Sequence, residues 1–295
     1  MAEHYAGLGL LCGVLAAAVV AGWLARRSAI AVRHIVWIAV LGVAGERLLL
    51  PILRGWAARP GAQGDWLAWA VPSGNLYVGL GFAVVPPLLY CVWRRLPLTT
   101  LADVWAPAAL LVVAGARVDC FLRGCCWGDV CYDASVVAPV LTARDAWQIY
   151  TIPRLCGAGW PLAVTFPYGS PAHAQHVLMG LFSAPSTAAL PCHPTQLYEA
   201  TGAVLIAAVL LWRFSRRTYA LQIWCWAVGA YCLLRFGLEF LRADHEAVWH
   251  GLTGVQAISL LLLTIVVLCA ALARRAQTHQ KSRTGRTSQT SRTNY

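Results

Sequence analysis

The chain has 295 residues, of which 59% are hydrophobic and 12% are charged, and its mean hydropathy is +0.61. A soluble domain carries about twice that charged fraction, so the composition excludes an ordinary soluble protein and indicates an integral membrane protein. The net charge of +11 does not indicate nucleic-acid binding, because six of the 23 basic residues lie after Leu272 in a tail without acidic residues.

Seven apolar windows are long enough to cross a bilayer, whose hydrocarbon core needs about 20 helical residues. We therefore predict an all-α integral membrane protein with about seven transmembrane helices and a small extracytoplasmic cap between spans four and five. The first window lacks a basic leader, so we expect a retained span rather than a cleaved signal peptide. The windows are Leu8–Leu24, Ile35–Leu53, Leu76–Trp93, Leu101–Val118, Leu197–Trp212, Leu221–Leu241 and Leu252–Leu272.

Basic residues predict the orientation, since cytoplasmic loops are enriched in Lys and Arg. They follow the first, third, fifth and seventh windows, which places the N-terminus outside and the C-terminus in the cytoplasm. We expect residues 1–276 to form the membrane domain and the polar, basic segment 277–295 to be a disordered cytoplasmic tail. The residues that carry this pattern are Arg26, Arg27, Arg33, Arg94, Arg95, Arg213, Arg216, Arg217, Arg274 and Arg275.

The outer segment 119–196 is nearly eighty residues long and contains many prolines and aromatic residues. A loop of this length is usually functional or disordered, and its apolar content favours a small folded cap. It also contains the cysteines that lie outside the apolar windows, which can pair or do chemistry. A disulfide between Cys131 and either Cys156 or Cys192 suits an outward-facing location, although pairing cannot be read from sequence.

The stretch Arg117–Gly128 begins where an apolar window ends and contains three cysteines, Cys120, Cys125 and Cys126. An arginine at a membrane border stays charged and needs an anion or water. Glycines at 124 and 128 allow close backbone approach and positive φ. A helix end with a snorkelling arginine explains this stretch equally well.

The segment Cys192–Glu199 opens the fifth window. Pro194 suits a first helical turn and Thr195 is a candidate cap. A capped helix start is the plain interpretation. However, polar side chains at a membrane boundary need partners, and four of them lie within seven residues, namely His193, Gln196, Tyr198 and Glu199.

Within the sixth window, separations of four and three residues place Arg235, Glu239 and Arg242 on one helical face. A local Arg–Glu–Arg ladder is one explanation, with Glu239 neutralising one arginine. One carboxylate cannot satisfy two guanidinium groups, and Arg117 lies at a similar depth. Because the planar guanidinium matches phosphate, the pattern favours a phospholipid headgroup as ligand.

Three segments together resemble the bacterial prolipoprotein diacylglyceryl transferase family. Its Arg-x-Gly-Asn-Phe-x-Asn-Gly-Glu-x-x-Gly signature, His-Pro-Ser-Gln-Leu-Tyr-Glu segment and Arg-x-x-x-Glu-Phe-x-Arg helix correspond in order and spacing to three stretches here. These are Arg117–Gly128, His193–Glu199 and Arg235–Arg242. The chain is identified on these motifs as a divergent, cysteine-rich member.

Three positions depart from the family pattern. Cys120 replaces an asparagine, Cys125 replaces a glutamate, and Ser73-Gly74-Asn75 replaces the His-Gly-Gly that carries an important histidine. A catalytic histidine therefore cannot be placed at Ser73, and His193 is the candidate general base.

The resemblance implies an enzyme of the bacterial inner membrane that needs no cofactor. It would transfer a diacylglyceryl group from phosphatidylglycerol to the lipobox cysteine of a prolipoprotein signal peptide. Arg117 and Arg235 would stabilise the phosphate, with His193 as the third catalytic residue. The candidate substrate-binding residues are Ser73, Asn75, Cys120, Cys125, Gln196, Tyr198, Glu199, Glu239 and Arg242.

Two alternatives remain open from the sequence. One is a thiol-redox or metal-site protein that uses Cys120, Cys125, Cys126 and His193, although Cys-x4-Cys-Cys is not a standard zinc spacing. The other is a phospholipid-binding or transport protein without catalysis.

Overall fold

The computed structural model describes residues 7–45, 76–131, 160–178, 188–242, 247–249 and 252–290, and gives no side-chain detail for 76–83, 247–249 and 279–290. The chain forms two compact units. The smaller unit is Ala18–Trp105, and the larger combines Met1–Ala17 with Ala106–Tyr295.

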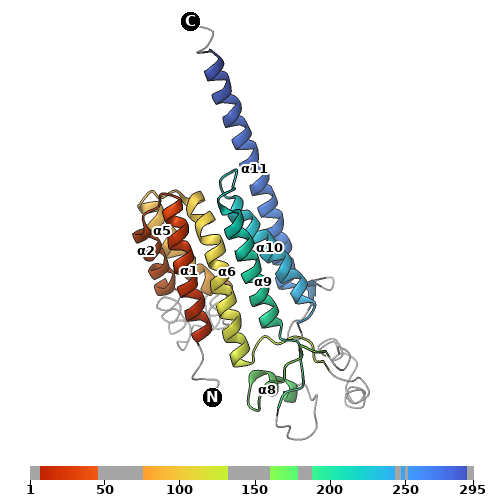
Figure 1. Ribbon diagram of the computed structural model, residues 1–295. Coiled ribbons are helices and arrows are strands. Elements are labelled where there is room, and N and C mark those ends of the chain that lie inside the picture. Colours follow the sequence, from red (N-terminus) through yellow and green to blue (C-terminus); the bar gives the residue numbers. More distant parts are fainter. Residues whose placement is uncertain are drawn as a thin grey trace, which may run out of the picture. The chain divides into compact units, whose positions relative to one another are not determined.

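The described regular structure is helical apart from one short hairpin (Figure 1). In chain order the helices are α1 (Leu8–Arg27), α2 (Val32–Ala44), α5 (Leu76–Trp93), α6 (Leu98–Arg123), α8 (Pro171–Leu178), α9 (Thr195–Phe214), α10 (Gln222–Glu239) and α11 (Gly254–Thr290). Strands β1 (Ala247–Trp249) and β2 (Leu252–Thr253) pair antiparallel between α10 and α11.

Within the described residues, four helical segments are long and apolar enough to cross a membrane, namely Leu8–Arg27, Leu98–Arg123, Thr195–Phe214 and Gly254–Thr278. Two shorter apolar segments are Val32–Ala44 and Val84–Trp93. Helix α10 is not among them, because it carries the polar side chains of Gln222, Arg235 and Glu239. The structure thus confirms a helical protein of membrane character, while the count of seven spans remains a prediction.

The helix boundaries differ from the predicted windows in three places. Helix α6 continues to Arg123, so Arg117 lies inside it rather than at its border. At the start of α9, Pro194 is the N-cap residue, and the Thr195 hydroxyl does not cap the helix but donates to the carbonyl of Cys126. Helix α11 extends to Thr290, beyond the end of the seventh window at Leu272, while the disordered character of segment 277–295 remains a prediction.

In the larger unit, α10 packs against both α9 and α11 (Figure 1). The beginning of α1 packs against α6 through glycines. A Cβ added to Gly13 would lie 2.7 Å from the carbonyl oxygen of Leu111, so the two backbones are in direct contact. Such small-residue contacts are typical of helix pairs in membranes. The carboxylate of Asp119 accepts the N–H groups of Gly9 and Leu10, which satisfies two donors in the first turn of α1.

In the smaller unit, α2 and α5 pack together. The Nδ1 atom of His34 lies 2.8 Å from the hydroxyl of Tyr90, which joins the two helices.

The described parts of the outer segment share a small hydrophobic core. Val130 and Val164 form isolated antiparallel bridges to Cys192, and the carbonyl of Gly124 accepts the N–H of Ala172 at the start of α8. Much of the segment lies outside the described residues, so the complete cap remains a prediction. The buried residues of this core are Trp127, Val130, Phe166, Ala172, Ala189 and Cys192.

Candidate functional site

A tight turn follows α6 and leads the chain toward the start of α9. Gly124 has φ of +70°, and a Cβ at this position would lie 3.1 Å from both Phe166 and Ser170. Cys126 also has positive φ, at +61°, which is uncommon for a residue with a side chain. Glycine is therefore required at position 124 both by the positive φ and by the lack of room for a Cβ atom.

The first residues of α9 hold this turn by its carbonyl groups. Gln196 Nε2 donates to the carbonyl of Cys125 at 2.6 Å, and Thr195 donates to that of Cys126 at 2.9 Å. Gln196 and Thr195 are buried. Gln196, predicted to bind substrate, thus positions the turn in this structure.

Gly128 lies where the backbones of three segments meet. Its N–H donates to the carbonyl of His193 at 2.9 Å, and it bridges to Arg242. An added Cβ would lie 2.6 Å from the carbonyl oxygen of Leu241 and 2.6 Å from Thr195 Cγ2. Only a residue without a side chain fits between these segments, which explains the final glycine of the signature.

Glu199 connects three helices at the centre of the site. Its Oε1 lies 2.9 Å from Nε of Arg117 on α6 and 4.0 Å from Nε of Arg235 on α10. The hydroxyl of Tyr231 donates to the same oxygen at 2.5 Å. The side chains of Arg117 and Arg235 are 14% and 11% exposed, and that of Glu199 is 3% exposed. The two arginines that the sequence associates with phosphate therefore converge on one buried carboxylate.

Glu239 completes this polar cluster. Its Oε2 lies 2.9 Å from NH1 of Arg235, one turn earlier on α10, and its Oε1 accepts the hydroxyl of Thr253 at 2.8 Å. The predicted pairing of Glu239 with an arginine is confirmed. Glu199 is a second carboxylate in this cluster and pairs with Arg117. The formal charges of Arg117, Arg235, Glu199 and Glu239 therefore cancel.

His193 is 4% exposed and lies between aromatic side chains. Its Nδ1 lies 3.3 Å from the hydroxyl of Tyr198, and its ring centroid lies 5.2 Å from that of Trp160. Trp160 also donates to the Tyr198 hydroxyl at 3.0 Å. Burial lowers the pKa of His193, so its imidazole is neutral near pH 7 and has one nitrogen able to accept a proton.

Three cysteine sulfurs come together beside the arginines. The Sγ atoms of Cys120, Cys125 and Cys126 all lie within 4.8 Å of one another, and the three residues are partly buried. Contacts from the other two thiols, followed by the positive charges of Arg242 and Arg117, lower the pKa of Cys126. By contrast, Cys131 and Cys192 are buried, and no disulfide joins these two residues.

Among the described residues, Tyr231, Thr253 and Asp119 make polar contacts that were not predicted. The sequence contains a signal for Tyr231, which precedes Arg235 by the same four-residue step that separates Arg235 from Glu239. No comparable local signal identifies the other two. The predicted substrate-binding residues Ser73 and Asn75 lie outside the described residues.

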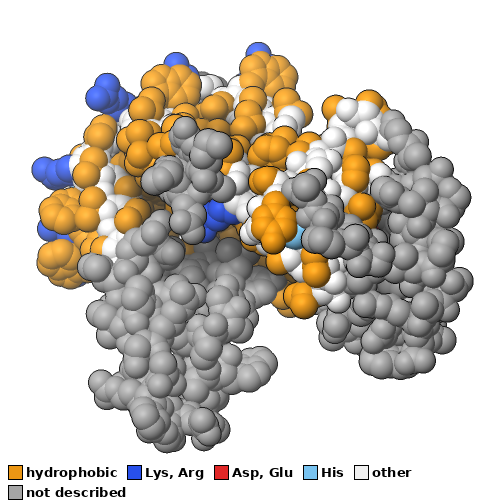
Figure 2. All heavy atoms as spheres, turned by 90° about the horizontal axis from the view of Figure 1, so that it is seen from below, with side chains coloured by type: hydrophobic (Ala, Val, Ile, Leu, Met, Phe, Trp, Pro, Cys, Tyr) orange, Lys and Arg blue, Asp and Glu red, His pale blue; other side chains and the backbone are white. Residues whose placement is uncertain are grey.

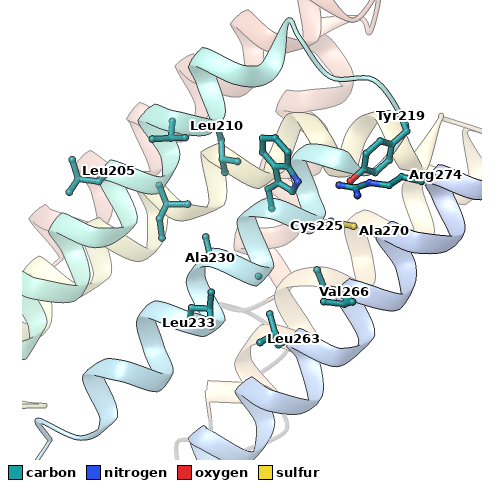
Figure 3. A pocket seen from close by; sticks show the side chains of 15 residues that line it. Leu205, Leu210, Tyr219, Cys225, Ala230, Leu233, Leu263, Val266, Ala270 and Arg274 are labelled. Carbon is teal, nitrogen blue, oxygen red and sulfur yellow. The ribbon is translucent and has the colours of Figure 1, made fainter.

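An apolar groove lies apart from this cluster, along α9, α10 and α11 (Figure 3). It has a volume of about 570 Å³, and its lining includes Leu205, Leu233, Val266 and, at one end, Tyr219 and Arg274. Apolar side chains dominate this lining, so the groove is unsuited to a phosphate along most of its length. In the view of Figure 2, the surface of the described residues is largely hydrophobic, and some basic side-chain atoms and a histidine are visible within it.

Known proteins match most of the chain. The family model described as prolipoprotein diacylglyceryl transferase matches residues 3–272. Phosphatidylglycerol–prolipoprotein diacylglyceryl transferase 2 of Streptomyces coelicolor is 30% identical over 217 residues, 68% of this chain and 63% of that protein. The phosphatidylglycerol–prolipoprotein diacylglyceryl transferase of Rhodococcus jostii is 28% identical over 73% of this chain and 54% of its own length. The protein of the same name from Paraburkholderia phymatum is 29% identical over 58% of this chain and 50% of its own length.

The chain thus spans between half and just under two thirds of the length of these curated relatives. The family match covers nearly all of the described helices and includes all three motif segments. This helical membrane protein belongs to the prolipoprotein diacylglyceryl transferase family.

Proposed function

We propose that the protein transfers the diacylglyceryl group of phosphatidylglycerol to the cysteine of a prolipoprotein lipobox, in the bacterial inner membrane. The convergence of Arg117 and Arg235, from separate helices, on Glu199 carries this proposal. Family membership and the names of the relatives support it.

The proposed topology has seven spans, α1, α2, α5, α6, α9, α10 and α11. The N-terminus is outside and the C-terminus is in the cytoplasm, in agreement with the distribution of basic residues. Residues 119–196 then form an outer cap above the cluster around Glu199. Polar residues on the inner face of α10 are compatible with a span, because such residues in membranes face the protein interior.

In the proposed reaction the cysteine thiolate attacks the glycerol carbon that bears the phosphate. The new C–S bond forms as the C–O bond breaks, and glycerol phosphate leaves with the electron pair. A guanidinium has five N–H donors, so pairing of Arg117 through Nε leaves its terminal nitrogens for a phosphate. Arg117 and Arg235 hold the headgroup and stabilise the charge that develops on the leaving group.

The thiol proton needs an acceptor, and His193 is the proposed base. Its lowered pKa keeps the imidazole neutral, and its contact with Tyr198 orients the ring. Gln196 and Thr195 position the turn that follows Arg117. Glu199 and Glu239 align the two arginines, while Arg242 adds positive charge near the turn.

The test is a transfer assay with the purified full chain in vesicles that contain labelled phosphatidylglycerol, with a lipobox peptide as acceptor. Arg117→Ala and Arg235→Ala should each lower the rate by about a hundredfold or more, as expected for loss of a donor to the developing charge. Arg123→Ala is the matched control, because Arg123 is the last residue of α6 and is exposed.

Unchanged transfer in both arginine variants would refute the role of the arginines. Lipid binding without transfer in the wild-type protein would instead identify a non-catalytic phospholipid-binding protein.

A further inference from the structure

Cys120, Cys125 and Cys126 form a compact group of sulfurs that the proposed transfer reaction does not use. Cys120 lies in the last turn of α6, and the other two follow in the turn. Their Sγ atoms are all within 4.8 Å of one another. Metal–sulfur bonds of about 2.3 Å place ligand sulfurs about 3.8–4.0 Å apart, so the three atoms can bind one ion with small side-chain rotations.

The backbone holds the sulfurs together before any ion binds. Positive φ at Gly124 and Cys126 turns the chain back over the end of α6. Thr195 and Gln196 hold the carbonyls of Cys126 and Cys125 from the start of α9. The three cysteines are only partly buried, which leaves a route for an ion to enter.

The local charge suits thiolate ligands. Arg117 and Arg242 both act on Cys126 with positive charge. Three thiolates and one monovalent cation carry a net charge of −2, of which Arg242 offsets a part, while Arg117 is paired with Glu199. The number of ligands also selects the metal. Thiolates favour soft d¹⁰ ions, and zinc takes four protein ligands in structural sites. This cluster, among the described residues, has three members.

We propose that Cys120, Cys125 and Cys126 bind one cuprous ion through three thiolates. The ion replaces the thiol protons, which pass to solvent, and no change of oxidation state is required. The site is independent of the transferase reaction proposed above, because no residue of the phosphate cluster is a ligand.

The experiment uses the purified full chain, reduced and under anaerobic conditions, titrated with Cu(I) against a chromophoric copper chelator. We expect one tightly bound ion per chain and X-ray absorption that fits three sulfurs at about 2.2–2.3 Å. The variant C120S/C125S/C126S should lose this ion. A matched variant that lacks three other cysteines, C12S/C232S/C269S, should retain it.

Alkylation of the wild-type protein tests the same site without relying on a variant that folds. Cu(I) should protect Cys120, Cys125 and Cys126 from iodoacetamide, compared with the same protein treated without Cu(I). Equal labelling with and without Cu(I), or coordination by fewer than three sulfurs, would overturn the proposal. A disulfide within the cluster that withstands the reducing conditions, or equal preference for Zn(II), would also overturn it.

Discussion

Replacing Glu199 by glutamine removes a carboxylate that lies beside both Arg117 and Arg235. At an effective permittivity of about 20, a carboxylate 2.9 Å from a guanidinium nitrogen gains roughly 6 kcal/mol, and one at 4.0 Å gains roughly 4 kcal/mol. Desolvation of a carboxylate that is 3% exposed offsets several kcal/mol of this sum. Glu199→Gln should therefore lower the free energy of unfolding by about 3–5 kcal/mol, the usual result of leaving a buried charge without its partner.

The double variant Arg117→Gln/Glu199→Gln separates this charge effect from a loss of packing. Each single substitution leaves the four-residue cluster with a net charge, whereas the double variant restores neutrality and keeps the pair between Arg235 and Glu239. We expect the double variant to be less destabilised than the sum of the two single variants by 1 kcal/mol or more, within the range of about 0.5–3 kcal/mol for contacting residues. Unfolding measured in detergent, as a function of denaturant, gives all four values. Strict additivity, or a loss below about 1 kcal/mol for Glu199→Gln, would refute the central role of this carboxylate.

Three further predictions concern stability. Gly128→Ala should lower both the melting temperature and the transfer rate, because the new Cβ would lie 2.6 Å from a backbone oxygen. Gly237→Ala, whose Cβ would have nothing within 4 Å, should lower neither. Equal losses in the two variants would contradict the close packing at Gly128. The pKa of His176 is lowered to about 4, by burial first and by His173 second. His176 therefore contributes roughly 3 kcal/mol above its unfolded pKa of about 6.5, and this is lost as pH falls from 6.5 to 4. Melting temperatures of wild type and His176→Asn should converge over that interval, and a constant difference would refute the assignment. Gly13→Ala should destabilise the contact of α1 with α6, while Gly22→Ala, whose Cβ would lie 3.9 Å from its nearest neighbour, serves as control in thermal unfolding.

Whether a contact can be predicted from the sequence depends on how far apart in the chain the contacting residues lie. Runs of apolar residues located α1, α6, α9 and α11, since a bilayer requires a fixed length of helix. The spacing of Arg235, Glu239 and Arg242 was enough to predict that Glu239 pairs with one arginine of this helical face, and the structure shows that the partner is Arg235. In α10 the polar residues that form the site lower the apolar content, so this helix, although covered by the sixth predicted window, is less apolar than the four candidate spans.

The contacts between helices could not be predicted in this way. Arg117 and Glu199 are brought together by the packing of α6 and α9, and no local period of the sequence specifies that crossing. The three sulfurs meet because Cys126 adopts a left-handed conformation that its residue type disfavours.

The sequence by itself therefore determined the membrane character of this protein, its three motif segments and the pairing within α10. Its tertiary structure decided that Glu199 neutralises Arg117 and that three cysteines form one cluster. The physical reason is that periodicity acts within one helix, whereas these contacts depend on backbone turns and helix packing between segments distant in the chain.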